Sequence, residues 1–283
     1  MTRRPRIGLL LPRSHCTRYS TSHMAMVLRM LGDAGAVVDV IYPAERAIDL
    51  STVRVEHDLY VHRKMSGLAF SLAGALHQQG AVIVNPYPVS AALRDKIVAS
   101  RILQGAGVPI PPTYVASTLE ELVPLLADGP LVVKPYQGAG GHDVCVAATA
   151  DELARAQTRD HAPLFAQRYL RSDGRDRKIY AIGDRLFGVK KVFPRETEAE
   201  RQGEPFTLTP ELRAIALRCG RAFGIDLYGV DIIESDGRPY VVDMSSIPGY
   251  KGVPDAPRLL AEYFYAAAER AARGEPVLQE TLA

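Results

Sequence analysis

Two carboxylates interrupt neighbouring apolar segments in the C-terminal half of this 283-residue chain: Asp231 within residues 228–233 and Asp243 within 240–245. The Ser-Asp-Gly-Arg stretch at 235–238 between them predicts a β-hairpin. A three-residue loop would place Asp231 opposite Asp243, with Ser245 on the same face, because strand side chains alternate. Paired carboxylates repel unless a cation or a shared proton neutralises them, and Mg²⁺ takes such oxygen ligands beside water and phosphate. The pattern predicts a metal site; the alternative is two unrelated aspartates, one at a strand end and one in a turn.

A second group of residues has the chemistry of a phosphate site. Lys134 ends an apolar strand just before the glycine-rich stretch 137–143, which contains Gly138, Gly140 and Gly141. Glycines allow a backbone to approach an anion closely and to turn its N–H groups toward it. The stretch is neither a P-loop nor a dinucleotide fingerprint. The alternatives are a plain hairpin turn and a strand-edge lysine whose charge lies in solvent.

Basic residues are concentrated between positions 168 and 195, where nine Lys and Arg face three Asp in a chain of net charge +2. A three-residue loop at 183–185 would set Lys178 opposite Lys190. Like charges facing each other are unfavourable unless a polyanion such as a nucleotide's phosphates lies across them. A two-residue loop would separate the two lysines, and a solvated basic surface is the alternative interpretation.

The elements that must position these residues follow from apolar patterning. Continuous apolar strands alternate with helices through residue 88, which predicts a parallel sheet covered on both faces. Beyond it, mixed helices and hairpins predict an α+β arrangement within an α/β protein overall. Ser90 is expected to cap one helix that runs to about Gly105. The other expected elements are strands at 7–11, 37–41, 58–61, 81–84, 131–134, 144–147 and 164–167, hairpins at 178–192 and 228–244, and helices at 22–31, 68–77, 119–127, 150–157, 210–223 and 257–273.

Composition excludes several classes of protein. With 47% apolar and 23% charged residues, the chain is neither disordered, collagenous nor a coiled coil, and its charge is too balanced for a dedicated nucleic-acid binder. Cys16, Cys145 and Cys219 are isolated, so neither a zinc site nor a disulfide framework is expected. The apolar run after the N-terminal arginines is too short for a signal peptide, and the uncharged stretch 65–93 is too polar for a membrane span. We therefore expect a cytoplasmic protein.

Taken in order, these motifs resemble the ATP-grasp superfamily over nearly the whole chain. The matching segments are Arg94-Asp95-Lys96, Val133-Lys134-Pro135 with its glycine loop, Gln167-Arg168-Tyr169-Leu170, residues 176–183, Gly229-Val230-Asp231 and residues 242–249. The resemblance implies an ATP-grasp fold with three parts. Residues 1–88 would be a Rossmann-like pre-domain, 89–166 a central subdomain, and 167–283 a C-terminal subdomain with the metal site.

The resemblance also implies roles for individual residues. Lys96 and Lys134 would contact the phosphates of ATP or the edge of its adenine. A loop that contains Gly138, Gly140 and Gly141 would cover the phosphates. The backbone of Gln167, Tyr169 and Leu170 would bind the adenine. Lys178 would contact the γ-phosphate and Lys190 would be a second catalytic cation, while Asp231, Asp243 and Ser245 would hold Mg²⁺. Two positions depart from the family pattern: Arg168 stands where an acidic residue is usual, and Ser245 where Asn is usual.

Two branches of the superfamily are similar to different parts of the chain. Chain length and Gly174-Arg175-Asp176 are similar to alpha-L-glutamate ligases, whereas residues 178–184 and 248–254 are similar to inositol trisphosphate kinases. We expect an ATP- and Mg²⁺-dependent ligase that forms an amide bond through an acyl phosphate. A small-molecule kinase and a nucleotide-binding protein without turnover are the alternatives. The expected partners are small-molecule or peptide carboxylates and amines, with neither nucleic acid nor membrane, and a homo-oligomer is left open.

The second substrate is expected between the first domain and the C-terminal half. His62, Arg63 and Lys64 follow a predicted strand, and ligands gather at the carboxyl ends of parallel strands. Tyr250 and Lys251, just after the metal segment, are also expected to line this pocket. The alternative for 62–64 is an ordinary polar loop.

Overall fold

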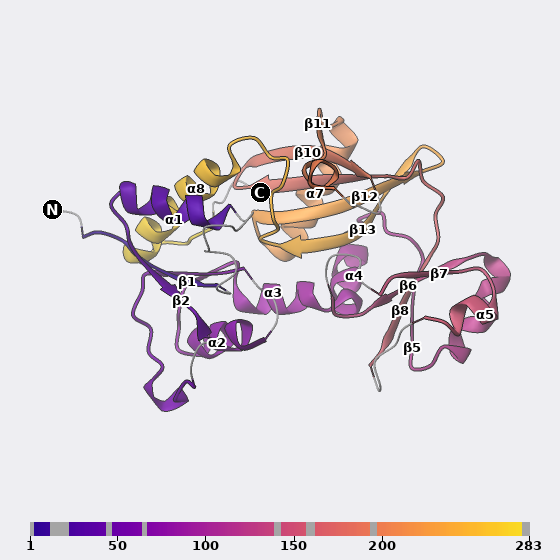
Figure 1. Ribbon diagram of the computed structural model, residues 1–283, viewed down its shortest axis with the longest axis horizontal. Coiled ribbons are helices and arrows are strands. Elements are labelled where there is room, and N and C mark those ends of the chain that lie inside the picture. Colours follow the sequence, from indigo (N-terminus) through magenta and orange to yellow (C-terminus); the bar gives the residue numbers. More distant parts are fainter. Residues whose placement is uncertain are drawn as a thin grey trace.

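A computed structural model describes residues 3–11, 23–43, 47–63, 67–138, 143–156, 162–192 and 197–278. Its strands form three sheets, here called the N-terminal, central and C-terminal sheets (Figure 1). The N-terminal and central sheets lie toward opposite ends of the long axis, and two helices, α3 (Tyr87–Arg94) and α4 (Lys96–Gly105), run between them. In the described ranges, no helix combines the length and the apolar composition needed to cross a bilayer.

The N-terminal sheet is parallel, with strand order β2-β1-β3-β4. Its strands are β1 (Arg6–Leu10), β2 (Val37–Ile41), β3 (Leu59–His62) and β4 (Ile83–Val84), and its helices are α1 (Met24–Asp33) and α2 (Gly67–Gln78). Alternate residues of the strands enter two different cores: Ile7 and Leu9 pack on the side of α1, and Leu10 and Tyr60 on the side of α2. The continuous apolar strands read from the sequence therefore reflect burial on both faces.

The central sheet is antiparallel, with strand order β5-β8-β6-β7. It comprises β5 (Thr113–Ala116), β6 (Leu131–Pro135), β7 (Cys145–Ala147) and β8 (Leu164–Arg168). One face packs against the 3-10 helix η4 (Glu120–Asp128) and α5 (Ala150–Leu153). Because side chains alternate along a strand, Lys134 and Gln167 lie on the other face, away from that core.

The C-terminal sheet is the largest and is antiparallel, with strand order β11-β10-β9-β12-β13. Its strands are β9 (Arg175–Ile182), β10 (Arg185–Val192), β11 (Glu204–Phe206), β12 (Leu227–Ser235) and β13 (Arg238–Ser246). One face carries α7 (Pro210–Phe223) together with residues of α3 and α4, and the other carries α8 (Ala256–Ala272). The short helix α6 (Glu198–Gln202) precedes β11.

Polar contacts join the N-terminal sheet to the end of β13. The side chain of Asn85, just after β4, donates to the Leu227 carbonyl at 2.6 Å and to Ser246 Oγ at 2.9 Å. Ser90 Oγ lies 3.1 Å from the same Ser246 hydroxyl. All four residues are buried, so these bonds fix the strand end that carries Ser245 relative to the N-terminal sheet.

Several expected elements differ from the structure. The helix expected from Ser90 to Gly105 is two helices, because Asp95 has an extended backbone and caps α4 by accepting from the N–H groups of Ile97 and Val98. The expected helix at 119–127 is a 3-10 helix that contains Pro124, which has no N–H to donate. Strand β5, helix α6 and strand β11 were not expected. The division at residues 88 and 166 stays a proposal, and the packing of Leu93 and Leu103 in the core of the C-terminal sheet argues for assigning both helices there.

Candidate active site

Asp231 and Asp243 face each other across β12 and β13, as the sequence predicted. The hairpin that produces this register differs from the one that the sequence predicted. The hairpin loop has two residues, Asp236 and Gly237, both with positive φ, rather than three. A β-bulge restores the pairing: Ile232 pairs with Val241 while Asp231 pairs with Asp243, so Val242 is the extra residue. Ser245 pairs with Gly229 two positions on and shares the aspartates' face.

Lysines balance the charge of this carboxylate pair. Lys178, which pairs with Asp231 in the β9–β12 register, lies with its Nζ 2.7 Å from Asp231 Oδ1. Burial raises the pKa of Asp243, and the charge of Asp231 adds to this effect, whereas Lys96 and Lys134 oppose it. Within the described ranges, no three His, Cys, Asp or Glu side chains are grouped as metal ligands. A metal ion held here would therefore need serine, water or phosphate oxygens beside the two carboxylates.

Lys134 joins the central sheet to this pair. Its Nζ donates to Gln167 Oε1 at 2.8 Å and to the carbonyl of Val242 at 3.2 Å. Val242 is the bulged residue, so the irregularity that aligns the aspartates also presents an acceptor to Lys134. Burial lowers the pKa of Lys134, and the nearby Asp243 opposes that shift.

The N-terminus of α4 completes the arrangement. Lys96 is its first residue, and its Nζ donates to the Gly138 carbonyl at 2.8 Å, which ties the helix to the start of the glycine loop. A small cavity of about 20 Å³ opens where α4, β8 and β13 meet, with Lys96, Gln167 and Asp243 on its polar side. Apolar side chains form the rest of its wall, including Leu103, Ile110, Phe165 and Met244. The lining of this cavity therefore combines charged and apolar side chains.

The residues expected to border the adenine, at the end of β8, differ in their surroundings. Gln167 is buried, Tyr169 is exposed with its N–H donating to the Pro130 carbonyl at 2.9 Å, and Leu170 is half-buried. Arg168 points to the opposite side of the sheet, where its guanidinium donates to the carbonyls of Gly129 and Leu125. The departure from an acidic residue therefore has a structural role. Gly140 and Gly141 lie outside the described residues.

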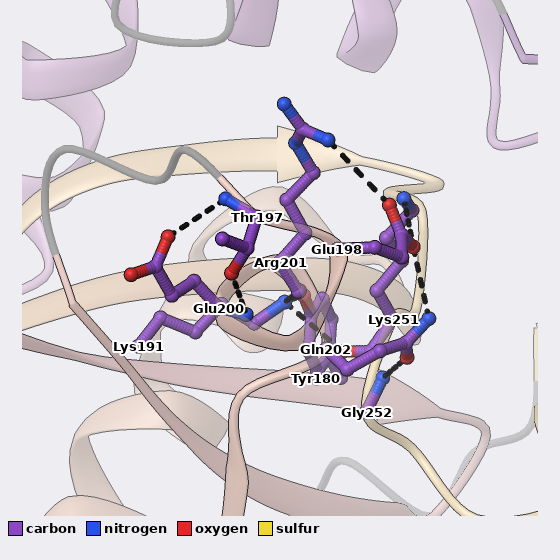
Figure 2. A network of polar contacts seen from close by, with 9 residues as sticks. All are labelled: Tyr180, Lys191, Thr197, Glu198, Glu200, Arg201, Gln202, Lys251 and Gly252. Carbon is purple, nitrogen blue, oxygen red and sulfur yellow. Dashed lines mark hydrogen bonds and ion pairs between the residues drawn. The ribbon is translucent and has the colours of Figure 1, made fainter.

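The prediction that Lys178 opposes Lys190 is wrong. The β9–β10 turn has two residues, so Lys190 pairs with Arg177 and lies on the other face, 5.5 Å from the centre of the Phe206 ring. Its neighbour Lys191 shares the face of Lys178 and was missed. Lys191 is buried, and its Nζ donates to Tyr180 Oη and to the carbonyls of Arg201 and Lys251 (Figure 2). The Gly-Asp pair at 183–184 is typical of a two-residue hairpin loop, and it was the sequence feature that could have predicted this register.

The residues expected around the second substrate fall into two groups, buried residues and residues close to Gly249. His62 is 1% exposed and lies against Phe70, and burial lowers the His62 pKa to about 4, so it is a core residue. Tyr250 is also buried, with its hydroxyl donating to the Ala181 carbonyl. Arg63 and Lys251 both lie close to Gly249. Lys64 lies outside the described residues.

Comparison with known proteins identifies the architecture. The profile of the RimK-like ATP-grasp domain matches residues 93–257, more than half of the chain. The chain belongs to the RimK-like ATP-grasp family. A probable alpha-L-glutamate ligase of Alkalilimnicola ehrlichii is 28% identical over 279 residues, covering 90% of this chain and 93% of that protein.

Solved ATP-grasp structures have the same fold. A RimK domain protein from Sphaerobacter thermophilus superposes with a TM-score of 0.72 at 20% identity, covering 91% of this chain and 98% of that one. The ATP-grasp ligase PsnB, in complex with a minimal precursor, Mg and ADP, superposes with a TM-score of 0.69 at 17% identity, covering 95% and 99%. The expectations of an α/β ATP-grasp fold and of an ATP-grasp enzyme of the carboxylate–amine ligase type are confirmed.

Proposed function

We propose that this chain joins a carboxylate to an amine in an ATP- and Mg²⁺-dependent reaction that passes through an acyl phosphate. One observation carries the proposal: Lys134 of the central sheet bonds to the bulge that aligns Asp231 with Asp243 in the C-terminal sheet. Lys96 of α4, Gln167 of the central sheet and Asp243 of the C-terminal sheet also line one small cavity at this junction. This is the charge pattern that a magnesium–nucleotide complex requires, because the cations face phosphate oxygens and the carboxylates face the metal.

The donor set fits magnesium. Asp231 and Asp243 supply hard carboxylate oxygens on one face, and Ser245 adds a neutral hydroxyl two residues along the same strand. These three residues would hold the ion, which neutralises charge on the phosphates when bound. Lys178 would contact the γ-phosphate from beside Asp231.

The nucleotide would lie between the central and C-terminal sheets. Lys96 and Lys134 would bind its phosphates and Gln167, Tyr169 and Leu170 would border its base, beneath a loop that includes Gly138, Gly140 and Gly141. The cavity has room for about one water molecule, so it could form only one edge of the nucleotide site. Lys190 is not part of this proposal, because it lies on the other face of its strand.

The reaction balances without any further reactant. A carboxylate oxygen attacks the γ-phosphorus and ADP leaves; an amine then attacks the acyl carbon, phosphate leaves, and the amine loses a proton. Positioning and charge neutralisation provide most of the catalysis in such transfers. The name of the Alkalilimnicola relative suggests L-glutamate as one substrate to test, and we propose that the reaction takes place in the cytoplasm.

A release assay over pooled carboxylates and amines tests this function. ADP formation that depends on an added amine, together with a product of the summed mass less water, is the expected result. ADP formation with a new phosphomonoester would instead establish a kinase. Tight ATP binding without any turnover would establish a nucleotide-binding protein.

A further inference from the structure

Lys191 is a buried lysine that the proposed reaction does not use. It is only 5% exposed, and lysines are rarely buried unless polar groups surround their charge. Its Nζ donates to Tyr180 Oη at 3.0 Å, to the Arg201 carbonyl at 2.8 Å and to the Lys251 carbonyl at 3.0 Å. These acceptors belong to β9, to α6 and to the loop that follows β13, so one ammonium joins three separate segments (Figure 2).

The backbones of β10, α6 and this loop approach one another closely at two glycines. Gly203, directly after α6, and Gly252, in the loop, both have positive φ, at 71° and 85°. A Cβ atom built on Gly203 would overlap the carbonyl oxygen of Lys190, and one built on Gly252 would overlap that of Gln202. The side chain of Gln202 also accepts from the Gly252 N–H at 3.0 Å. The three segments are therefore packed backbone to backbone around Lys191, and a glycine is required at both positions.

Lys191 also satisfies the C-terminal end of α6. This five-residue helix begins with a capping box formed by Thr197 and Glu200 (Figure 2). The last carbonyls of a helix have no partner within it, and a cation close to them is favourable. Lys191 supplies such a partner by donating to the Arg201 carbonyl. Because so short a helix is not stable in water by itself, α6 depends on contacts of this kind.

Tyr250 anchors the middle of the loop to β9. It is buried, its hydroxyl donates to the Ala181 carbonyl at 3.2 Å, and its ring centre lies 5.5 Å from that of Tyr180. Tyr180 is also the residue whose hydroxyl accepts from Lys191. Packed contacts therefore lead from Lys191 through the loop toward Pro248.

Pro248 brings the loop to Ser245, one of the proposed metal ligands. A Cβ atom built on Gly229 would lie 3.0 Å from Pro248 Cγ and 3.3 Å from Ser245 Oγ. Gly229 is the cross-strand partner of Ser245, so the proline ring and the serine hydroxyl both lie beside the same glycine. The position of Pro248 therefore limits the positions that the Ser245 hydroxyl can take.

We propose that Lys191 is a positioning residue of the enzyme, which holds α6 and residues 247–252 so that Pro248 keeps the Ser245 hydroxyl directed toward the metal site. The inference rests on the proposed ligase function and adds a residue outside its site. In this role Lys191 touches neither the nucleotide nor the metal. Without its ammonium, buried carbonyls of both segments would lose a donor, and the segments would shift to recover hydrogen bonds to water.

Hydrogen exchange of the ligand-free protein tests whether Lys191 holds these segments. Lys191→Met keeps an apolar side chain of similar length but removes the three N–H donors. Exchange read by mass spectrometry should become about tenfold faster or more in residues 198–203 and 247–253, as for a local opening made easier by the loss of a hydrogen bond. Exchange in β12 and α7 should stay at the wild-type rate.

Nucleotide and Mg²⁺ binding, measured by calorimetry, give a second readout. Without Mg²⁺, a non-hydrolysable ATP analogue should bind Lys191→Met and the wild type equally well, because Lys96 and Lys134 are unchanged. With the analogue bound, Mg²⁺ should bind the variant about tenfold more weakly, as is typical when the support of a metal ligand is lost. A residue that only stabilised the fold would not separate the two affinities in this way.

A second substitution tests whether Lys191 acts through Ser245. In a Ser245→Ala background, Lys191→Met should cause no further loss of Mg²⁺ affinity, because the hydroxyl through which it acts is absent. Lys190→Met is the matched control: the same substitution one position earlier lies on the other face of β10 and should leave exchange and binding unchanged. Should Lys191→Met fail to fold, Lys191→Gln, which keeps two N–H donors, takes its place with a smaller effect in the same direction.

The possible results separate this inference from the proposed function. A wild-type protein that binds no ATP analogue, or whose bound analogue takes up no Mg²⁺, would refute the ligase function. With normal wild-type binding, the positioning role alone would be overturned by unchanged Mg²⁺ affinity in Lys191→Met, by equal losses with and without Ser245, or by faster exchange throughout the chain. Weaker binding of the analogue without Mg²⁺ would overturn it too, since Lys191 would then contact the phosphates. Failure of both Lys191 variants to fold would make Lys191 a residue of the core and would also overturn it.

Discussion

Replacing Lys134 by Met tests whether the lysine at the end of β6 binds nucleotide or only supports the structure. Methionine keeps a flexible apolar side chain of similar length but removes the ammonium. A charge-assisted hydrogen bond to a phosphate contributes about 1.5–3 kcal/mol, so the variant should bind ATP roughly 10- to 100-fold more weakly.

The expected effect on stability is small because two contributions oppose each other. Gln167 Oε1 loses the donor that lies 2.8 Å away, which costs about 1–3 kcal/mol for a buried acceptor. Against this, burial lowers the pKa of Lys134, so the folded protein binds that proton less tightly than the unfolded chain does. The charged ammonium therefore costs the fold some stability at neutral pH, and removing it returns that part. We expect a net loss of no more than about 1–2 kcal/mol of unfolding free energy.

The assay pairs calorimetric titration of ATP with a urea melt of the protein without nucleotide. Arg185→Met, at the exposed β9–β10 turn, is the matched control for loss of a cation, and its ATP affinity should equal that of the wild type. Unchanged ATP affinity in Lys134→Met would refute our placement of the phosphates. Unfolding of the variant at low urea would show that the lysine is mainly structural.

Four other substitutions and one pH titration probe the site and its scaffold. Asp243→Asn should reduce turnover by on the order of 100-fold or more at saturating Mg²⁺ while the melting curve stays cooperative, and near-normal rates would exclude the metal assignment. Because burial raises the pKa of Asp243, the wild-type protein should lose Mg²⁺ affinity on acidification at a higher pH than that at which an ordinary aspartate, with a pKa of about 3.9, protonates, as measured by Mg²⁺ titration across pH. Lys178→Met should abolish turnover whereas Lys190→Met should retain most of it, since only the first faces Asp231; equal losses in steady-state kinetics would contradict the observed register. Gly220→Ala should destabilise the fold by about 1–3 kcal/mol, because its Cβ would lie 2.6 Å from the ring of Tyr228, and an unchanged urea midpoint would refute this packing argument.

Local sequence patterns were enough to predict most helices and strands and the pairing of Asp231 with Asp243. Apolar runs separated by helical periodicity predicted the parallel N-terminal sheet, because burial on both faces requires continuous apolar strands. Strand alternation placed Ser245 on the face of Asp243 without knowledge of the turn. The short elements α6 and β11 could not be predicted, since their few residues carry no usable periodicity.

The sequence was least informative about the register in which strands pair. One residue more or less in a hairpin loop moves every side chain to the other face. At the β9–β10 turn this made the pairing of Lys178 with Lys190 wrong, whereas at the β12–β13 turn the bulge at Val242 compensated for the misjudged loop and left Asp231 opposite Asp243.

The amino-acid sequence indicates which residues have suitable functional groups and, through the two-residue period of strands, which of them share a face. Which faces then meet depends on the packing of the whole chain. The contact between Lys134 and the Val242 carbonyl joins two sheets, and Arg63 meets the loop at Gly249 across almost 190 positions. No local pattern encodes such contacts, because they depend on how whole sheets pack through cores assembled from distant segments.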